Sequence, residues 1–176
     1  MAQFLDRIIR AAKLDVTLYE EVEADEKALG QALGVVVLSS VAAGIGFGGD
    51  GIGGVVAGTL WALLGWYIWA FLTYVIGTKL LPEPQTKADH GQLLRTIGFA
   101  SAPGLVRILG FIPAVTGLIF FGAAIWMLIA MIIAVRQALD YQSTLRAVGV
   151  CLIGWLVQAV ILVVVLLIGS GAAGRP

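Results

Sequence analysis

The sequence predicts an all-α, polytopic membrane protein with five transmembrane helices, preceded by short amphipathic and acidic helices. Of its 176 residues, 60% are hydrophobic and 12% are charged, whereas soluble domains carry about 25% charged residues. Residues 55–76, 114–135 and 147–169 contain no charged residue at all. About 20 helical residues cross a hydrocarbon core of roughly 30 Å, so each of these runs is long enough to span a bilayer.

Residues 1–27 are expected to form a cytoplasmic module of two short helices. The first helix has an apolar face opposite a charged face that includes Arg7, Arg10 and Lys13. This pattern fits either a helix lying among lipid headgroups, with its basic face on anionic lipid, or a helix docked on its own bundle. Both interpretations remain open from the pattern.

An acidic segment follows, because residues 15–26 contain six acids and no base. Thr17 and Glu20 have the spacing of a capping box, which predicts that a second helix begins there. Asp25 is placed to cap a helix that runs from Glu26 into the membrane. The acids form either a solvated face or a surface for a basic partner or a cation.

The first two spans are predicted at about 30–47 and 55–76, and residues 44–54 between them read GIGFGGDGIGG. This stretch matches G-x-G-x-x-G twice, but no strand precedes it and no acid lies about twenty positions beyond it. A dinucleotide site is therefore excluded. The glycines predict a tight turn at the membrane surface, with Asp50 at its tip.

The third apolar segment, 93–112, is the least regular, because it contains Arg95, Pro103 and Arg107 and stops at Pro113. Before it, Pro82 and Pro84 block helix continuation, and Asp89 is placed to cap a helix beginning at His90. We expect this segment to span the membrane, with a re-entrant loop as the alternative. The remaining spans are predicted at 114–135 and 147–169, within a membrane domain of residues 28–169 followed by a short tail, 170–176.

Basic residues favour the cytoplasmic side of a membrane. With five spans, nine of the eleven Lys and Arg residues share one side with the N-terminus, and Arg107 and Arg175 lie on the other. A re-entrant third segment also gives a split of nine to two. The N-terminus is therefore expected in the cytoplasm, and five spans place the C-terminus outside.

Several single residues are candidates for structural or partner contacts. Arg107 is the basic residue expected within a span, and its long side chain is predicted to reach the far interface near Pro113. Gln158, in the middle of the last span, is expected to bond to another helix, with lining of a pathway as the alternative. Trp61 and Trp66 are expected to pack within the bundle, although lipid or a hydrophobic ligand would also suit them.

The polar connector between the last two spans is expected to hold Asp140 electrostatically between Arg136 and Arg146, with Arg136 one helical turn before the acid. His90 lies outside the spans, so no buried imidazole is expected for haem ligation. The serines of the spans have no histidine nearby. We therefore expect no catalytic residues, no cofactor and no metal, and no nucleic-acid partner.

Two stretches resemble the bacterial branch of the Yip family, the Ypt/Rab-interacting five-span membrane proteins. They are residues 18–38, an acidic lead into the first span, and residues 98–139, which carry the family's glycine, aromatic and proline positions and a Trp-containing span. Those positions are Gly98, Phe99, Pro103, Pro113 and Arg136. The resemblance implies five helices, a cytoplasmic N-terminus, and a non-enzymatic role in membrane organisation or trafficking, with a small GTPase as a candidate partner.

The leading functional hypothesis is a non-catalytic scaffold or adaptor in a bacterial cytoplasmic membrane. Its expected partners are the lipid bilayer and other membrane proteins or further copies of itself. The alternatives are a small oligomeric channel or transporter, and an accessory subunit of a larger membrane complex.

Overall fold

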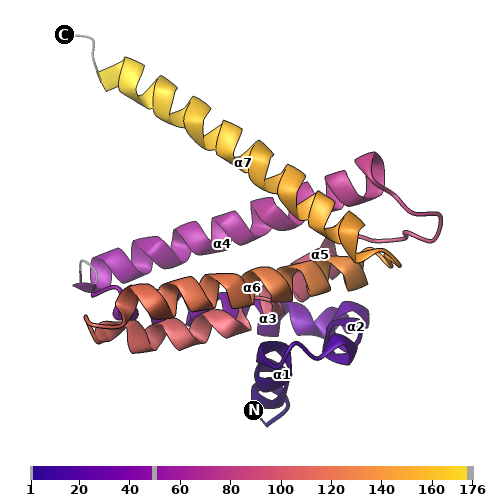
Figure 1. Ribbon diagram of the computed structural model, residues 1–176, viewed down its shortest axis with the longest axis horizontal. Coiled ribbons are helices and arrows are strands. Elements are labelled where there is room, and N and C mark those ends of the chain that lie inside the picture. Colours follow the sequence, from indigo (N-terminus) through magenta and orange to yellow (C-terminus); the bar gives the residue numbers. More distant parts are fainter. Residues whose placement is uncertain (1, 49–50, 174–176) are drawn as a thin grey trace.

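The computed structural model describes residues 2–48 and 51–173, and every regular element in these ranges is helical, as predicted. In chain order the elements are α1 (Ala2–Ala12), α2 (Val16–Ala24), the short 3₁₀ turn η1 (Glu26–Ala28), α3 (Leu29–Gly46), α4 (Gly51–Val75), the π-helical turn η2 (Ile76–Leu80), α5 (His90–Phe99), the 3₁₀ segment η3 (Ala102–Phe111), α6 (Thr116–Ala138) and α7 (Thr144–Ala173). The helices α3 and α6 pack on either side of η3, and α1 and α2 cover one side of this layer (Figure 1). The helix α7 packs at its start and diverges from α6 toward its other end.

The two predicted N-terminal helices are present, but the second begins differently from the prediction. Asp15, rather than Thr17, caps α2, because its carboxylate accepts hydrogen bonds from the backbone N–H and the hydroxyl of Thr17. The capping box of Thr17 and Glu20 is therefore wrong. The prediction for Asp25 is confirmed, since its side chain accepts from the backbone N–H of Lys27 at the start of η1.

The glycine-rich stretch joins α3 to α4 as a tight turn. Gly48 and Gly51 have φ values of +68° and +69°, a left-handed conformation that glycine adopts without steric cost. The predicted turn is confirmed at these flanking glycines, while Asp50 lies outside the described residues. At the other end of α4, regular helix ends at Leu80, just before Pro82, as predicted.

Four helices of the described chain are long and apolar enough to cross a membrane: Glu26–Gly46, Gly51–Leu80, Thr116–Ala138 and Thr144–Ile161. They correspond to the predicted spans 30–47, 55–76, 114–135 and 147–169. The segment 93–112 is not among them, because it is divided into α5 and η3. The division has a local cause: Pro103 lacks the N–H that would bond to Phe99, and its ring would clash with the Phe99 carbonyl in a continuous α-helix.

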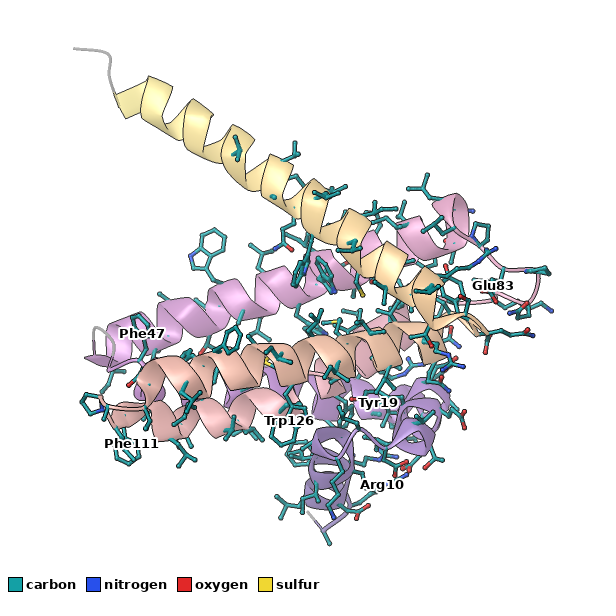
Figure 2. All side chains as sticks on the ribbon, viewed as in Figure 1. Arg10, Tyr19, Phe47, Glu83, Phe111 and Trp126 are labelled. Carbon is teal, nitrogen blue, oxygen red and sulfur yellow. The ribbon has the colours of Figure 1, made fainter. Side chains whose placement is uncertain are left out.

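Although divided, α5 and η3 follow α3 along its length and in the same direction. Gly98 lies against Ala32, Gly104 against Ser39, and Gly46 against the backbone carbonyl of Arg107. At each glycine an added methyl group would collide with its partner. The end of η3 therefore lies beside the end of α3, and Figure 2 shows Phe47 and Phe111 at one end of the bundle and Glu83 at the other.

Candidate functional site

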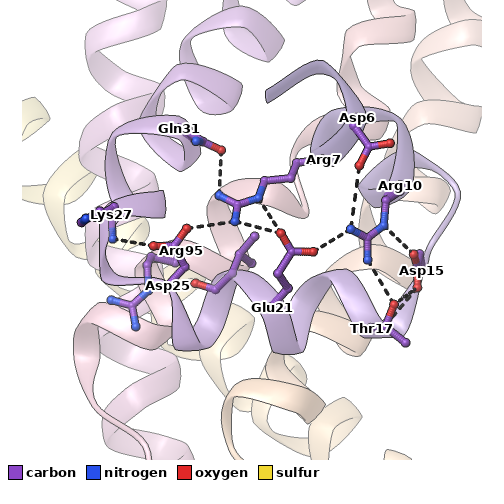
Figure 3. Close-up of polar contacts among 11 residues, drawn as sticks. Asp6, Arg7, Arg10, Asp15, Thr17, Glu21, Asp25, Lys27, Gln31 and Arg95 are labelled. Atoms are coloured by element: carbon purple, nitrogen blue, oxygen red, sulfur yellow. Dashed lines mark hydrogen bonds and ion pairs between the residues drawn. The ribbon is translucent and has the colours of Figure 1, made fainter. Parts of the chain in front are cut away.

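The N-terminal helices are joined to each other by a network of arginines and carboxylates (Figure 3). The side chain of Arg7 is only 3% exposed. Its Nε donates to Oε1 of Glu21 at 2.9 Å, and its Nη2 donates to Oδ2 of Asp25 at 2.9 Å. Its Nη1 donates to Gln31 of α3 at 3.0 Å. One guanidinium therefore links α1, α2 and α3.

A second arginine completes this network. Nε of Arg10 lies 2.8 Å from Oδ2 of Asp15, and its Nη1 lies 2.6 Å from Oε2 of Glu21. Hydrogen bonds from Arg10 and Arg7 hold the pKa of Glu21 below its usual value, and the bond from Arg7 does the same for Asp25. Of the two interpretations of this helix, these bonds support docking on the chain's own helices, because carboxylates of the following segment neutralise both arginines. The exposed side chains of α1 include Leu5 and Ile9, which are apolar.

Two further side chains hold the N-terminal helices on the membrane bundle. Arg95 of α5 is 7% exposed, and it donates from Nε to the carbonyl of Val22 at 3.0 Å and from Nη2 to the carbonyl of Glu23. Both acceptors lie in the last turn of α2, where backbone carbonyls lack helical partners and the helix dipole favours a cation. The indole N–H of Trp126 donates to the carbonyl of Ala12 at 2.8 Å. The N-terminal module is thus a built-in part of the fold.

A polar groove of about 530 Å³ lies between α2 and the segment that joins α6 to α7. Its acidic walls are Glu20, Glu23 and Asp140. Burial, with a smaller contribution from Asp140, raises the pKa of Glu23 to about 7. The basic residue in the groove, Arg136, donates to the carbonyls of Tyr141 and Gln142 at 3.2 and 3.3 Å.

These bonds correct the predicted pairing in the connector between the last two spans. Arg136 turns to backbone carbonyls rather than to Asp140, because the chain leaves the helix at that point and presents them. Arg146 instead lies 3.3 Å from Glu83, across the loop that follows η2. The hydroxyl of Tyr141 donates to the same loop region, 2.7 Å from the carbonyl of Leu81. The two polar connectors therefore form one surface.

A second cavity, of about 510 Å³, lies among the membrane helices. Its wall is predominantly apolar, and α3, α4, α5, η3, α6 and α7 all contribute to it. The polar side chains in the wall are Ser39, Ser40, Ser101, Arg107 and Gln158. Cys151 is buried and contributes to the same wall.

The side chain of Arg107 points away from the interface that it was predicted to reach. Its Nε donates to the carbonyl of Gly104 at 3.0 Å, and its Nη2 donates to the carbonyl and the hydroxyl of Ser39 at 3.1 and 2.8 Å. Gly104 precedes Arg107 in the chain, so the guanidinium lies back toward the middle of the bundle rather than toward Pro113. The snorkelling prediction is therefore wrong, because neutral acceptors on η3 and α3 hold the guanidinium inside.

The structure also corrects two other sequence interpretations. Gln158 makes no side-chain hydrogen bond to the described residues, and it lines the cavity instead of joining two helices. The imidazole of His90 has a buried Nε2 without a hydrogen-bond partner among those residues. Its ring packs against Tyr67 and Phe71 of α4, with centroid distances of 5.0 and 5.9 Å. His90 is therefore packed against the bundle, although it lies outside the predicted spans.

The remaining residues singled out in the sequence are spread over the bundle rather than gathered at one point. Phe99 is completely buried, Pro103 is buried in the first turn of η3, and Pro113 is exposed between η3 and α6. Trp66 donates to the carbonyl of Leu94 at 3.0 Å and also lines the cavity. Trp61 is 73% exposed on the outer face of α4. The packing expectation therefore fits Trp66 but not Trp61.

Sequence reasoning singled out Arg107 and Gln158 but missed the serines that line the cavity with them. Ser39 and Ser101 read as ordinary small residues in apolar helices, and only their position beside Arg107 or in the cavity wall distinguishes them. Arg95 was counted only among the cytoplasmic basic residues, although its position in an apolar segment could have indicated an internal contact. The pairing of Arg7 with Glu21 could have been predicted from the sequence, since a basic helix is followed directly by an acidic one.

The comparisons with known proteins agree with this architecture. The model of the Yip1 domain matches residues 18–166, which include most of α2, every element from η1 to α6, and most of α7. Neither the curated proteins nor the solved structures gave a match. The match covers most of the chain, and it includes the positions Gly98, Phe99 and Pro103 that carried the resemblance. The chain therefore belongs to the Yip1 domain family of membrane proteins.

Proposed function

We propose that this protein is a non-catalytic membrane scaffold that presents a fixed polar face to partner proteins in the cytoplasm of a bacterial cell. The observation that carries the proposal is the docking of the N-terminal module, in which Arg7 and Arg95 fix α2 against α3 and α5. A surface that is held rigidly before binding loses less conformational entropy when a partner docks. The fixed orientation of α2 is thus suited to recognition.

The proposed architecture has five crossings, with the N-terminus in the cytoplasm and the C-terminus outside. Ten residues of α5 and ten of η3 extend over about 35 Å at 1.5 and 2.0 Å per residue, enough for a core of roughly 30 Å. Gly98 contacts Ala32 near the start of α3, and Arg107 contacts Gly46 at the end of α3. The segment therefore follows most of α3, which supports a complete crossing rather than a re-entrant loop.

A compartment-sensitive reporter fused to the C-terminus tests this topology. The five-crossing proposal predicts that the reporter is active outside the cytoplasm, and a matched reporter at the N-terminus is active inside. Activity of both reporters in the cytoplasm would mean that residues 93–112 return to the side from which they enter.

The groove between α2 and the α6–α7 connector is the proposed contact surface. Glu20, Glu23 and Asp140 give it an acidic character, while its single arginine already binds backbone carbonyls. Complementary charge steers and orients partners, so the groove fits a basic segment of a partner. Membership of the Yip1 family makes a small GTPase one candidate class of partner.

Charge reversal tests the groove without removing the module. The variant Glu20→Lys places a cation in the groove, and Glu26→Lys makes the same charge change at an exposed acid outside it. A photo-crosslinking residue at position 142, in the wall of the groove, is expected to capture a protein partner in native membranes. Capture should fall at least fivefold in Glu20→Lys and stay unchanged in Glu26→Lys. Equal capture in both variants would exclude the groove as the contact.

A second contact surface is proposed within the membrane, on α4, for other membrane proteins or another copy of this chain. The apolar window of α4 is only 11% buried, the smallest fraction among the four long helices. Trp61 and Phe71 are exposed there, and Gly58 has open space around it. Aromatic side chains and small residues are both common at helix contacts in membranes.

A further inference from the structure

The cavity among the membrane helices contains a charge that the described chain does not neutralise. Arg107 donates only to neutral oxygens, those of Gly104 and Ser39. None of the ion pairs among residues 2–48 and 51–173 involves it. The surrounding sequence offers no carboxylate to pair with it, because residues 90–139 contain no Asp or Glu. A cation at this depth is stabilised when an anion comes within contact distance.

We propose that this cavity binds the headgroup of an anionic phospholipid, and that Arg107 holds its phosphate. The guanidinium is pre-oriented, since Nε and Nη2 are fixed by their bonds to Gly104 and Ser39. Nη1 makes no bond to the described residues and is not among their buried unsatisfied atoms, so it faces accessible space. A guanidinium with a free donor recognises phosphate oxygens well.

Two further donors lie in the same wall. The hydroxyl of Ser101 and the amide of Gln158 line the cavity, and neither side chain bonds to any described residue. Together with Arg107 they supply donors from η3, α7 and the turn after α5. A few polar donors in a predominantly apolar wall are typical of a site for a small polar group attached to an apolar body.

The rest of the wall indicates that the ligand is a lipid rather than a free anion. Trp66 and Trp69 of α4 and Met127 and Met131 of α6 give an apolar surface that suits acyl chains. Trp155 of α7 lines the cavity and is 53% exposed, and α7 diverges from the bundle toward its C-terminal end (Figure 1). The cavity is therefore continuous with the side of the bundle that faces the bilayer.

The depth of the site distinguishes it from ordinary surface binding of lipid. Ser39 lies seven residues before the end of α3 at Gly46, which is about 10 Å along the helix. The bound phosphate therefore lies below the level of the bulk headgroups and exchanges only when the lipid leaves the cavity. A lipid held in this way remains with the protein after purification in mild detergent.

Native mass spectrometry of the full chain in a neutral detergent tests the proposal, with phosphatidylglycerol and phosphatidylcholine as probes. The wild type is expected to bind one phosphatidylglycerol with an affinity at least tenfold higher than that for phosphatidylcholine. Arg107→Gln removes a charge-assisted bond and is expected to lower the phosphatidylglycerol affinity on the order of tenfold. Lys79→Gln, at an exposed lysine of η2, controls for the loss of one positive charge and should leave the affinity unchanged.

A second pair of variants keeps Arg107 in place. Gly65 lines the cavity, and a Cβ atom added there meets no other atom within 4 Å, so Gly65→Leu is expected to occupy part of the cavity. Gly122→Leu makes the same change at an exposed glycine of α6, outside the cavity. We expect Gly65→Leu to lose the bound lipid and Gly122→Leu to keep it.

Three results would overturn the proposal. The first is equal affinity of the wild type for the two lipids, and the second is unchanged phosphatidylglycerol binding in both Arg107→Gln and Gly65→Leu. The third is displacement of the lipid by millimolar inorganic phosphate, which would make the cavity a site for a free anion.

Discussion

The arginines of the N-terminal module and the arginine of the cavity are all at least partly buried, but their surroundings differ. Arg7 and Arg10 contact three carboxylates from the next helix, all within 3 Å. Arg107 contacts one hydroxyl and two carbonyls. A guanidinium paired within the chain completes the fold, whereas one with only neutral acceptors keeps its charge available to a ligand. The comparison thus separates a structural ion network from a candidate binding site.

The largest effect is expected from breaking the paired network. Arg7→Gln leaves Glu21 and Asp25 without their shared cation, and we expect it to lower the free energy of opening of the N-terminal module by about 2 kcal/mol. Hydrogen exchange of the α2 amides, followed by mass spectrometry in mild detergent, measures this opening. Lys13→Gln, at an exposed lysine in the turn directly after the same helix, should change it by less than about 0.5 kcal/mol. Equal exchange in Arg7→Gln and wild type would contradict the structural role of the network.

A smaller effect is expected from Arg95, which stabilises the module through carbonyls instead of carboxylates. Arg95→Met removes the bonds to Val22 and Glu23 and should cost on the order of 1.5 kcal/mol, because its acceptors are neutral. Arg95→Lys should recover part of this loss. If both variants open α2 as readily as Arg7→Gln, carbonyl and carboxylate partners would stabilise the module equally. That result would contradict the distinction between arginines with charged partners and arginines with neutral ones.

The smallest effect is expected from pH, through Glu23, a partly buried carboxylate of the module that has no arginine side-chain bond among the described residues. Burial raises the pKa of Glu23 from 4.5 to about 7, and Asp140, Glu20 and Asp89 add to the shift while Arg95 opposes it. The docked module therefore binds a proton that the open module releases, so docking weakens as pH rises from about 4.5 to 7. The pKa values of Glu21 and Asp25 are lowered, so their contributions are lost only in more acidic solution.

Hydrogen exchange of α2 at several pH values between 5 and 8, corrected for the intrinsic pH dependence of exchange, measures this effect. The free energy of opening should decrease with pH in the wild type and stay constant in Glu23→Gln. A decrease of the same size in Glu23→Gln would assign the pH dependence to another group.

The membrane helices were predictable because composition alone determines which runs can lie in lipid. The first span, predicted at 30–47, is observed as Leu29–Gly46, and the caps at Asp25 and Asp89 follow from local sequence. The division of residues 93–112 into α5 and η3 was harder to predict from the sequence, although Pro103 indicated an irregular helix. Around Pro103 the chain forms the 3₁₀ segment η3, which packs closely on α3. Its contacts there are with Ser39 and Gly46, two residues that lie far away in the sequence.

The candidate site was predictable only in part, for the same reason. The sequence identified Arg107 as an intramembrane charge, but the direction of its side chain depends on Ser39, which lies 68 residues away. The sequence also showed a basic helix followed by an acidic one, and interpreting them as separate surfaces overlooked their attraction. Long-range packing, rather than local propensity, decided both outcomes.

The most direct test of the comparison is a titration of wild type, Arg7→Gln and Arg107→Gln with phosphatidylglycerol under identical conditions, followed by native mass spectrometry. The account predicts that Arg7→Gln binds one lipid with an affinity within about twofold of the wild type, while Arg107→Gln loses about tenfold. Equal losses in the two variants, or no loss in either, would show that the partners of these arginines do not determine which one is available to lipid.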